Sequence, residues 1–183
     1  VLEVYATALA HIGKTGESID IYQKALLLGM PMVDVFNGVG TAFLLQKQYK
    51  EALENFEIAL QQSPDNIRVH QNLVIVYKEM GEINKVVQSA QIVLRHNRSE
   101  YTTISNLASM YKSLGLIEQA IALYERALRF QPDNDECKSN FLWCLLHSNR
   151  YNSKKLLSYA VFLRFCIIGS FLPITNFLEI IIL

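Results

Sequence analysis

The chain has 183 residues, of which 51% are hydrophobic and 19% are charged. That length suits one domain or one array of repeats with a sizeable core, and the hydrophobic content excludes a disordered chain. The 17 basic residues balance the 17 acidic ones, so the formal net charge is zero. This neutrality argues against a dedicated nucleic-acid binder, which usually carries a basic stripe, and we expect no nucleic-acid partner.

An internal repeat with a period of 34 residues dominates positions 1–134, and its first copies lie at 1–32 and 33–66. Each copy predicts two helices separated by a residue that tolerates positive φ, such as Gly13 in the first copy. Lys47 stands at that position in the second copy, where its side chain makes this conformation less favourable. Pro64 follows the second helix of that copy, because proline cannot continue a helix.

The next two copies lie at 67–100 and 101–134, with Gly81 and Gly115 between their helices. Arg98 replaces the proline of the third copy, and the fourth closes on the same Pro-Asp-Asn tripeptide as the second. An Asn or Asp at that point can accept hydrogen bonds from the first amides of the next helix. Each two-helix repeat leaves an apolar face that only a neighbour can cover, so we expect the repeats to stack into an α-solenoid.

This pattern resembles the tetratricopeptide repeat (TPR), whose motif favours Leu, a small residue, an aromatic, Gly, Ala, an aromatic, Ala and Pro. The resemblance implies an all-α, right-handed TPR superhelix of four to five helical hairpins that serves as a scaffold for protein binding. The copy at 101–134 has every residue of that motif: Leu107, Ala108, Tyr111, Gly115, Ala120, Tyr124, Ala127 and Pro132.

Residues 135–164 are expected to form a degenerate fifth repeat or a capping hairpin. Phe141 fits its first helix, and Asn149 can take the left-handed position that Gly would. The second helix fits poorly, because Lys154 and Ser158 stand where Ala and an aromatic residue are expected.

A hydrophobic tail at 165–183 follows, in which Glu179 is the one charged side chain after Phe165. Three interpretations stay open: a transmembrane helix, a packed terminal hairpin that covers the last repeat, or the product of truncation or a shifted reading frame. A membrane span needs about 20 apolar residues, but Pro173 and Asn176 interrupt this segment. Association with a membrane would come only through this tail, and we otherwise expect a cytoplasmic protein.

The residue types that carry catalysis or bind metals are scattered. His11, His70, His96 and His147 have no metal-ligand spacing, and a satisfied core position explains His70. Cys144 and His147 are three residues apart on one helix, a pairing that is usually incidental without an oxyanion site. We therefore expect a chain that is not an enzyme and that has no metal or other cofactor.

The odd number of cysteines fits neither a disulfide framework nor a zinc cluster. Cys137, Cys144 and Cys166 are expected to be buried free thiols in a reducing compartment.

Asparagines in strict 34-residue register, Asn72, Asn106 and Asn140, mark the candidate binding surface. Each directly precedes a buried position of a first helix, where it would face the inner groove of the array. An amide offers two donors and an acceptor, which matches a peptide main chain regardless of its side chains. In the second repeat Gly38 takes the register position, so Asn37 and Thr41 complete the candidate groove.

A narrower resemblance follows from this row of asparagines and from the segment SNFLWCLLHSNRYNSKKLLSYAVFLRF at 139–165. Both resemble the TPR region of O-linked N-acetylglucosamine transferase-like glycosyltransferases, where groove asparagines bind extended peptide. That resemblance implies a substrate-recruiting arm whose catalytic domain is absent here.

We expect a scaffold that binds an extended or helical peptide of a partner protein, with the transferase arm and a membrane-anchored TPR assembly factor as alternatives. A clamp for the C-terminal carboxylate of chaperones is not expected, because the first-helix positions that would supply its cations are uncharged. Those positions are Asn37, Thr41, Asn72, Thr102 and Asn106.

Overall fold

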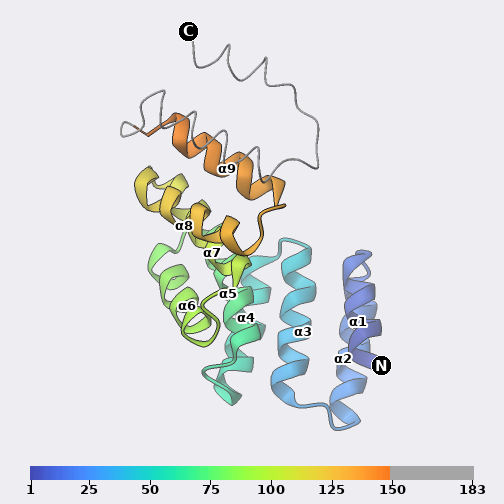
Figure 1. The fold of residues 1–183 in the computed structure, drawn as a ribbon. Coiled ribbons are helices and arrows are strands. Elements are labelled where there is room, and N and C mark those ends of the chain that lie inside the picture. The colour runs from blue at the N-terminus through green and yellow to red at the C-terminus, as the bar shows by residue number, and fades with distance from the viewer. Residues whose placement is uncertain (149–183) are drawn as a thin grey trace. The chain divides into compact units, whose positions relative to one another are not determined.

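The computed structural model describes residues 1–148, which form helices and no strand (Figure 1). The predicted all-α fold class is therefore confirmed over that range. The parts of the fifth repeat and the hydrophobic tail beyond residue 148 lie outside the described residues. The helices, in chain order, are α1 (Leu2–His11), α2 (Thr15–Leu27), α3 (Met32–Leu45), α4 (Tyr49–Gln62), α5 (Ile67–Met80), α6 (Ile83–His96), α7 (Tyr101–Ser113), α8 (Ile117–Phe130) and α9 (Asp135–Leu146).

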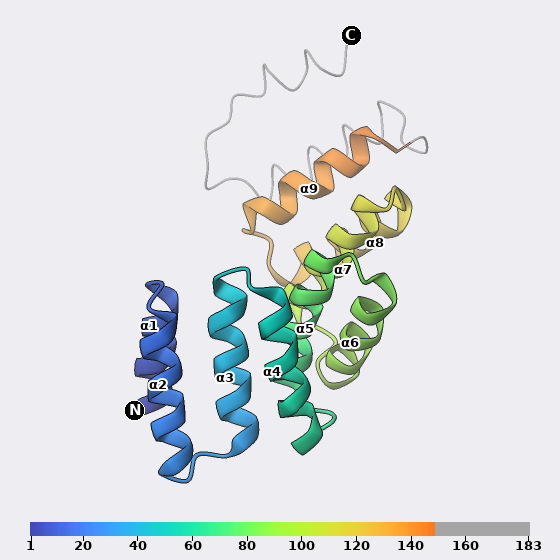
Figure 2. The ribbon, with the colours of Figure 1, turned by 180° about the vertical axis from the view of Figure 1, so that it is seen from behind.

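The chain divides into two units, residues 1–103 and the residues from 104 onward, with the boundary inside α7. In the first unit, α1 to α4 lie side by side and successive helices run in opposite directions, as the view in Figure 1 and the reverse view in Figure 2 both show. Short turns join α1 to α2, α3 to α4 and α5 to α6. These are the helical hairpins that the 34-residue pattern predicts.

Small residues on one helix and larger apolar ones on its neighbour build the core of the first unit. Ala52 and Ala59 of α4 flank Phe56, and all three are 0% exposed. The alanines let α5 approach closely, so that Leu73 fills the remaining space at 2% exposure. Burying a side chain of that size contributes about 1.5–3 kcal/mol, and the repeated contacts hold adjacent hairpins together.

Two glycines of α3 are sites where aromatic rings from neighbouring helices enter the helix surface. A Cβ atom on Gly38 would lie 2.2 Å from Cζ of Tyr22 in α2. A Cβ atom on Gly40 would lie 2.6 Å from Cε1 of Phe56 in α4. Both rings are almost fully buried, so α3 is held between α2 and α4 at a distance that only glycine allows.

The turns within the hairpins have the backbone that the sequence predicts. Gly13, Gly81 and Gly115 all have positive φ. Lys47 takes the same conformation with φ of 58°, as the one non-glycine residue with positive φ in the described part of the chain. Its amide N–H donates to the Leu44 carbonyl oxygen at 2.9 Å, which closes the last turn of α3.

The helices that follow the Pro-Asp-Asn tripeptides begin with the expected asparagine caps. Oδ1 of Asn66 accepts a hydrogen bond from the Val69 amide at 3.1 Å, and Oδ1 of Asn134 accepts one from the Cys137 amide at 2.7 Å. The third repeat lacks the proline, and the helix after it is capped by a different side chain. There the Glu100 carboxylate accepts a hydrogen bond from the Thr103 amide at 2.6 Å. Each of these side chains satisfies an amide that the helix itself leaves unpaired.

Replacing Gly40 by alanine should destabilise the first unit. The new methyl group would overlap the Phe56 ring, which is fully buried and has no room to withdraw. We expect the free energy of unfolding to fall by about 1–3 kcal/mol in urea denaturation, because inserting a methyl group into a packed core forces neighbouring groups to shift. Other repeats have alanine at the same register, at Ala6 and Ala108, so the requirement for glycine applies to this repeat and not to the register in general.

Gly16→Ala is the matched control, because it adds the same methyl group to helix α2, where no atom lies within 4 Å. This variant should be as stable as the parent or more stable by up to about 1 kcal/mol, since alanine favours helix. Equal destabilisation by both substitutions would show that Gly40 is not required for packing.

Replacing Lys47 by glycine should stabilise the chain. The left-handed conformation of Lys47 costs an L-residue about 1 kcal/mol, and glycine adopts it without that penalty. We expect a gain of roughly 0.5–1 kcal/mol in the free energy of unfolding. Lys24→Gly, made at an exposed position inside α2, should lose about 1 kcal/mol instead. A loss at both positions would contradict our account of the turn.

Candidate functional site

Polar side chains that link α1, α3 and α5 by hydrogen bonds and ion pairs form a surface, here called the inner face of the first unit. The helices that carry these side chains are the first helices of three successive repeats, as the sequence predicts for a groove. The inner face consists of Glu3, Asp34, Asn37, Thr41, Arg68 and Asn72.

Thr7 and Thr41 lie 34 residues apart, and their hydroxyl groups have different partners. Thr7 donates to the Glu3 carbonyl oxygen at 2.9 Å, and its hydroxyl lies 3.0 Å from the hydroxyl of Tyr22. Thr41 likewise donates to the carbonyl oxygen of the residue four positions earlier, at 2.7 Å. The residue that matches Tyr22 in the next repeat is Phe56, which has no hydroxyl. Thr41 Oγ1 therefore accepts from a different helix.

That donor is the amide of Asn72 on α5. Nδ2 of Asn72 lies 3.0 Å from Oδ1 of Asn37 and 3.1 Å from Oγ1 of Thr41. Both N–H groups of the Asn72 amide are thus directed at α3, and the orientation of the amide is fixed. The structure therefore joins three of the predicted groove residues in one hydrogen-bonded cluster.

The position of Asn37 follows from the packing of its neighbour. Gly38 occupies the register position of Asn72, and the Tyr22 ring fills the space in which a side chain there would lie. The amide of this repeat accordingly comes one residue earlier, where Asn37 is only 5% exposed. Asn37 thus supports Asn72 from within the structure, whereas Asn72 itself is half-buried.

One turn away on the inner face, a cation links the three first helices. Nη2 of Arg68 lies 2.9 Å from Oε1 of Glu3, and Nη1 lies 3.7 Å from Oδ1 of Asp34. The hydrogen bond with Glu3 raises the pKa of Arg68. Because Arg68 is exposed and both carboxylates are partly exposed, the ion pairs stabilise the fold only slightly, and they leave a local excess of one negative charge.

The second unit has its own polar cluster, formed by α7 and α9. Nζ of Lys112 donates to Oδ1 of Asn140 at 2.5 Å and lies 5.2 Å from the centre of the Trp143 ring. The His147 ring stacks on Trp143 with 3.9 Å between the ring centres. Asn140 was predicted from its register, whereas Lys112 and Trp143 were missed. The sequence did not predict Lys112 as a site residue because it lies in the last turn of α7, beyond the first-helix positions that face the expected groove.

The predicted row of asparagines therefore divides between the units. Asn37, Thr41 and Asn72 lie in the first unit, and Asn106 and Asn140 lie in the second. Asn106 is half-buried on α7. Since each unit is described by itself, the continuity of the row from Asn72 to Asn106 stays a prediction.

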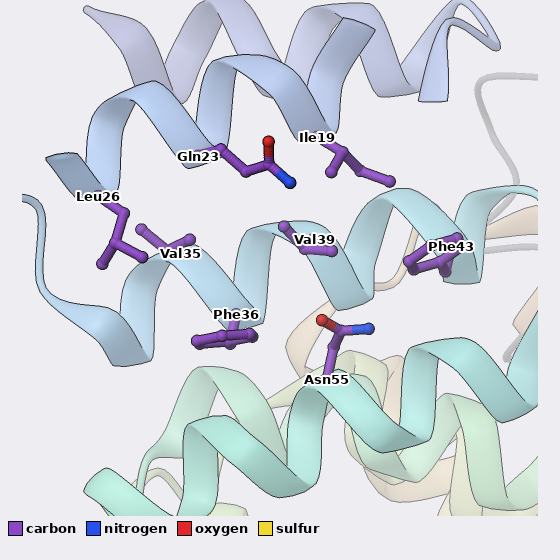
Figure 3. A pocket seen from close by; sticks show the side chains of 8 residues that line it. All are labelled: Ile19, Gln23, Leu26, Val35, Phe36, Val39, Phe43 and Asn55. Atoms are coloured by element: carbon purple, nitrogen blue, oxygen red, sulfur yellow. The ribbon is translucent and has the colours of Figure 1, made fainter. Parts of the chain in front are cut away.

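A groove that the sequence did not reveal lies on the first unit, over α3 and between α2 and α4 (Figure 3). Its volume is about 430 Å³, and apolar side chains form most of its wall. The apolar run Leu26–Leu28 at the end of α2 is a signal for it in the sequence, and Leu26 of that run lines the groove. Lining this groove are Ile19, Gln23, Leu26, Val35, Phe36, Val39, Phe43 and Asn55.

Three of the titratable groups singled out in the sequence, His70, His147 and Cys144, have structural roles. His70 is buried, as expected of a core histidine, and its Nε2 lies 2.8 Å from the Pro64 carbonyl oxygen. Its buried Nδ1 has no hydrogen-bond partner among the described residues, so the expectation of a fully satisfied ring is met only in part. Nδ1 of His147 lies 2.8 Å from the Trp143 carbonyl oxygen, one turn back along α9. Cys144 is buried, and burial raises the pKa of its thiol, which opposes formation of a nucleophilic thiolate.

Cys137 is likewise a buried free thiol, and burial raises its pKa to about 11, whereas Cys166 lies outside the described residues. Residues 1–148 contain no group of three or more His, Cys, Asp or Glu side chains that could hold a metal ion. Over the same residues, no helix is both long enough and apolar enough to cross a membrane.

Comparison with solved structures supports the helical-hairpin architecture. A structure of the protein MamA superposes with a TM-score of 0.76 at 11% identity, and the match covers 92% of this chain and 93% of that one. A second MamA structure matches with a TM-score of 0.67 at 19% identity, covering 87% and 92%. YrrB, described as a TPR protein with an unusual peptide-binding site, matches with a TM-score of 0.67 at 18% identity, covering 88% and 84%.

A search of curated proteins finds no match. A family model does match, and it describes the N-terminal TPR repeats region of Psidin. It extends over residues 43–164, from the last turn of α3 past the end of α9. The match covers well over half of the sequence, and the chain therefore belongs to the family of the Psidin N-terminal TPR repeats region.

Proposed function

We propose that this chain is a protein-interaction scaffold whose first helices bind an extended or helical peptide segment of a partner protein. Its membership of a TPR family supports this proposal, as does its similarity in fold to YrrB, whose structure is described as having a peptide-binding site. In this proposal Asn72, Asn106 and Asn140 contact the peptide main chain, while Asn37 and Thr41 hold Asn72 in position.

The observation that carries the proposal is the fixed orientation of the Asn72 amide. Its two N–H groups are directed at Asn37 and Thr41. Its Oδ1 atom has no hydrogen-bond partner among the described residues and is left to accept. A peptide main chain supplies N–H groups at regular intervals, so this acceptor can bind a peptide without selecting its side chains.

Asn140 has the opposite polarity. Its Oδ1 atom accepts from the Lys112 ammonium, which leaves the two N–H groups of Nδ2 to donate to a peptide carbonyl oxygen. The two asparagines would thus bind complementary groups of a main chain, one its N–H and the other its C=O.

Several finer statements belong to the same proposal. The array consists of repeats at 1–32, 33–66, 67–100 and 101–134, followed by a degenerate repeat or capping hairpin at 135–164 and the tail at 165–183. The chain acts in the cytoplasm without a catalytic activity or a cofactor of its own. The narrower resemblance to the substrate-recruiting arm of a glycosyltransferase stays a prediction.

The main-chain contact can be tested with peptides selected from a displayed library of random dodecapeptides. We expect the intact chain to enrich binders, and methylation of one peptide nitrogen to weaken one of these binders about tenfold, because the N–H that Asn72 accepts is lost. In the Asn72→Ala variant the same methylation should have little further effect. Isothermal titration calorimetry on the four combinations measures this coupling.

Asn84→Ala is the matched control, because Asn84 is an exposed asparagine on α6, a second helix. It should leave the affinity of every selected peptide unchanged, whereas Asn106→Ala and Asn140→Ala should each lower it several-fold. Peptides that bind all of these variants as tightly as the parent would refute the asparagine contacts. Failure to enrich any peptide would refute the proposed function itself.

The supporting role of Asn37 predicts an energetic coupling with Asn72. Removing the Asn72 amide leaves the buried Oδ1 of Asn37 without its donor, which should cost about 1 kcal/mol of stability. In a double-mutant cycle of Asn37→Ala and Asn72→Ala, urea denaturation should give a coupling of roughly 0.5–1.5 kcal/mol. Strictly additive losses would show that the two amides do not depend on each other.

A further inference from the structure

Lys112 is half-buried and has no acidic partner among the described residues, whereas the unpaired Lys24 and Lys47 are exposed. Arg68 and Lys138 each lie within 4 Å of a carboxylate, with Nζ of Lys138 at 3.2 Å from Oδ1 of Asp135. No carboxylate of the described residues lies within 4 Å of Nζ of Lys112. Its ammonium instead contacts the amide oxygen of Asn140 and the ring of Trp143.

These contacts hold the charge without neutralising it. An ammonium has three N–H donors, and the bond to Asn140 uses one of them. The side chain is half-buried against α9, so its conformation is already restricted before any ligand binds. Its charge also acts on a buried group. Burial raises the pKa of the Cys144 thiol, and the charge of Lys112 lowers it in part. A half-buried, unneutralised cation attracts an anion more strongly than a fully solvated one.

Trp143 provides an apolar surface directly beside this charge. The indole is 42% exposed even though Lys112 and His147 both lie against its ring. Exposed tryptophan is uncommon on a soluble surface and is enriched where proteins bind each other. Charge and apolar area therefore lie together on α7 and α9, where the Lys112 ammonium contacts both the Asn140 amide and the Trp143 ring.

We propose that Lys112, Asn140 and Trp143 bind an acidic peptide segment, in which an Asp or Glu side chain pairs with Lys112 and a neighbouring apolar side chain packs on Trp143. This inference rests on the proposed function and assigns the partner's chemistry at the second unit. The ligand is a side-chain carboxylate rather than a chain terminus, because the Asn140 amide beside Lys112 can hold a main chain that continues past the site. Thr102, at the start of the same helix, adds no second cation.

The selection from random dodecapeptides tests this preference, provided that each peptide is fused at its C-terminus so that it has no free terminal carboxylate. We expect enrichment of Asp or Glu next to an aliphatic or aromatic residue. Changing that acid to Asn in a synthetic peptide with blocked ends should weaken binding about tenfold, as loss of a charge-assisted hydrogen bond does. Trp143 is the only tryptophan of the chain, so its fluorescence reports binding at this site directly.

The variant Lys112→Gln should abolish the preference for acid, and Lys112→Arg should retain it, which separates the charge from any general effect on folding. Lys85→Gln is the matched control, because Lys85 also lies over an aromatic ring, at 5.3 Å from the centre of Tyr77, but has Glu82 as its acidic partner. It should leave the preference intact.

The outcomes distinguish this inference from the proposed function. Peptides that bind without a preference for acid, or whose preference survives Lys112→Gln, would overturn the inference while the scaffold function stands. A selection that yields no binders refutes the scaffold function, and the acidic site with it.

Discussion

The entry of the Tyr22 ring into the surface of α3 is the contact on which the inner face of the first unit depends. The ring occupies the space where a side chain at position 38 would begin, and a Cβ atom there would lie 2.2 Å from Cζ of Tyr22. Position 38 is therefore glycine, although the same register holds Asn72 in the next repeat. Packing between hairpins thus decides where α3 can present a polar side chain.

The contact of Tyr22 with Gly38 determines where Asn37 lies and how the Asn72 amide is oriented. Because position 38 is closed to a side chain, the amide of α3 comes from Asn37, which is buried. The buried amide needs a hydrogen-bond partner, and Asn72 on the following first helix donates to its Oδ1. Asn72 then has one orientation, with its N–H groups turned inward. An asparagine in the middle of a helix, unfavourable by helix propensity, is accounted for by tertiary contacts.

The sequence predicted the features that each repeat must build from its own residues. The helices, the left-handed turn at Lys47 and the caps at Asn66 and Asn134 all follow from local chemistry and from a period that makes every repeat alike. The partners of Asn72 could not be predicted, because the contact with Asn37 joins residues 35 positions apart and depends on a glycine that looks unremarkable in the sequence. The groove over α3 was missed for a related reason, since its walls come from three helices.

One register position has a different role in different repeats. Thr7, Thr41 and Trp143 occupy it in different repeats. Where the second helix supplies Tyr22, the hydroxyl of Thr7 is used inside the hairpin. Where the second helix supplies Phe56, which has no hydroxyl, the hydroxyl of Thr41 accepts from Asn72 on the inner face. In α9 the position holds an exposed indole beside a cation. The position thus changes its chemistry from repeat to repeat while the helical scaffold stays the same. The neutral overall composition gives no indication of this variation.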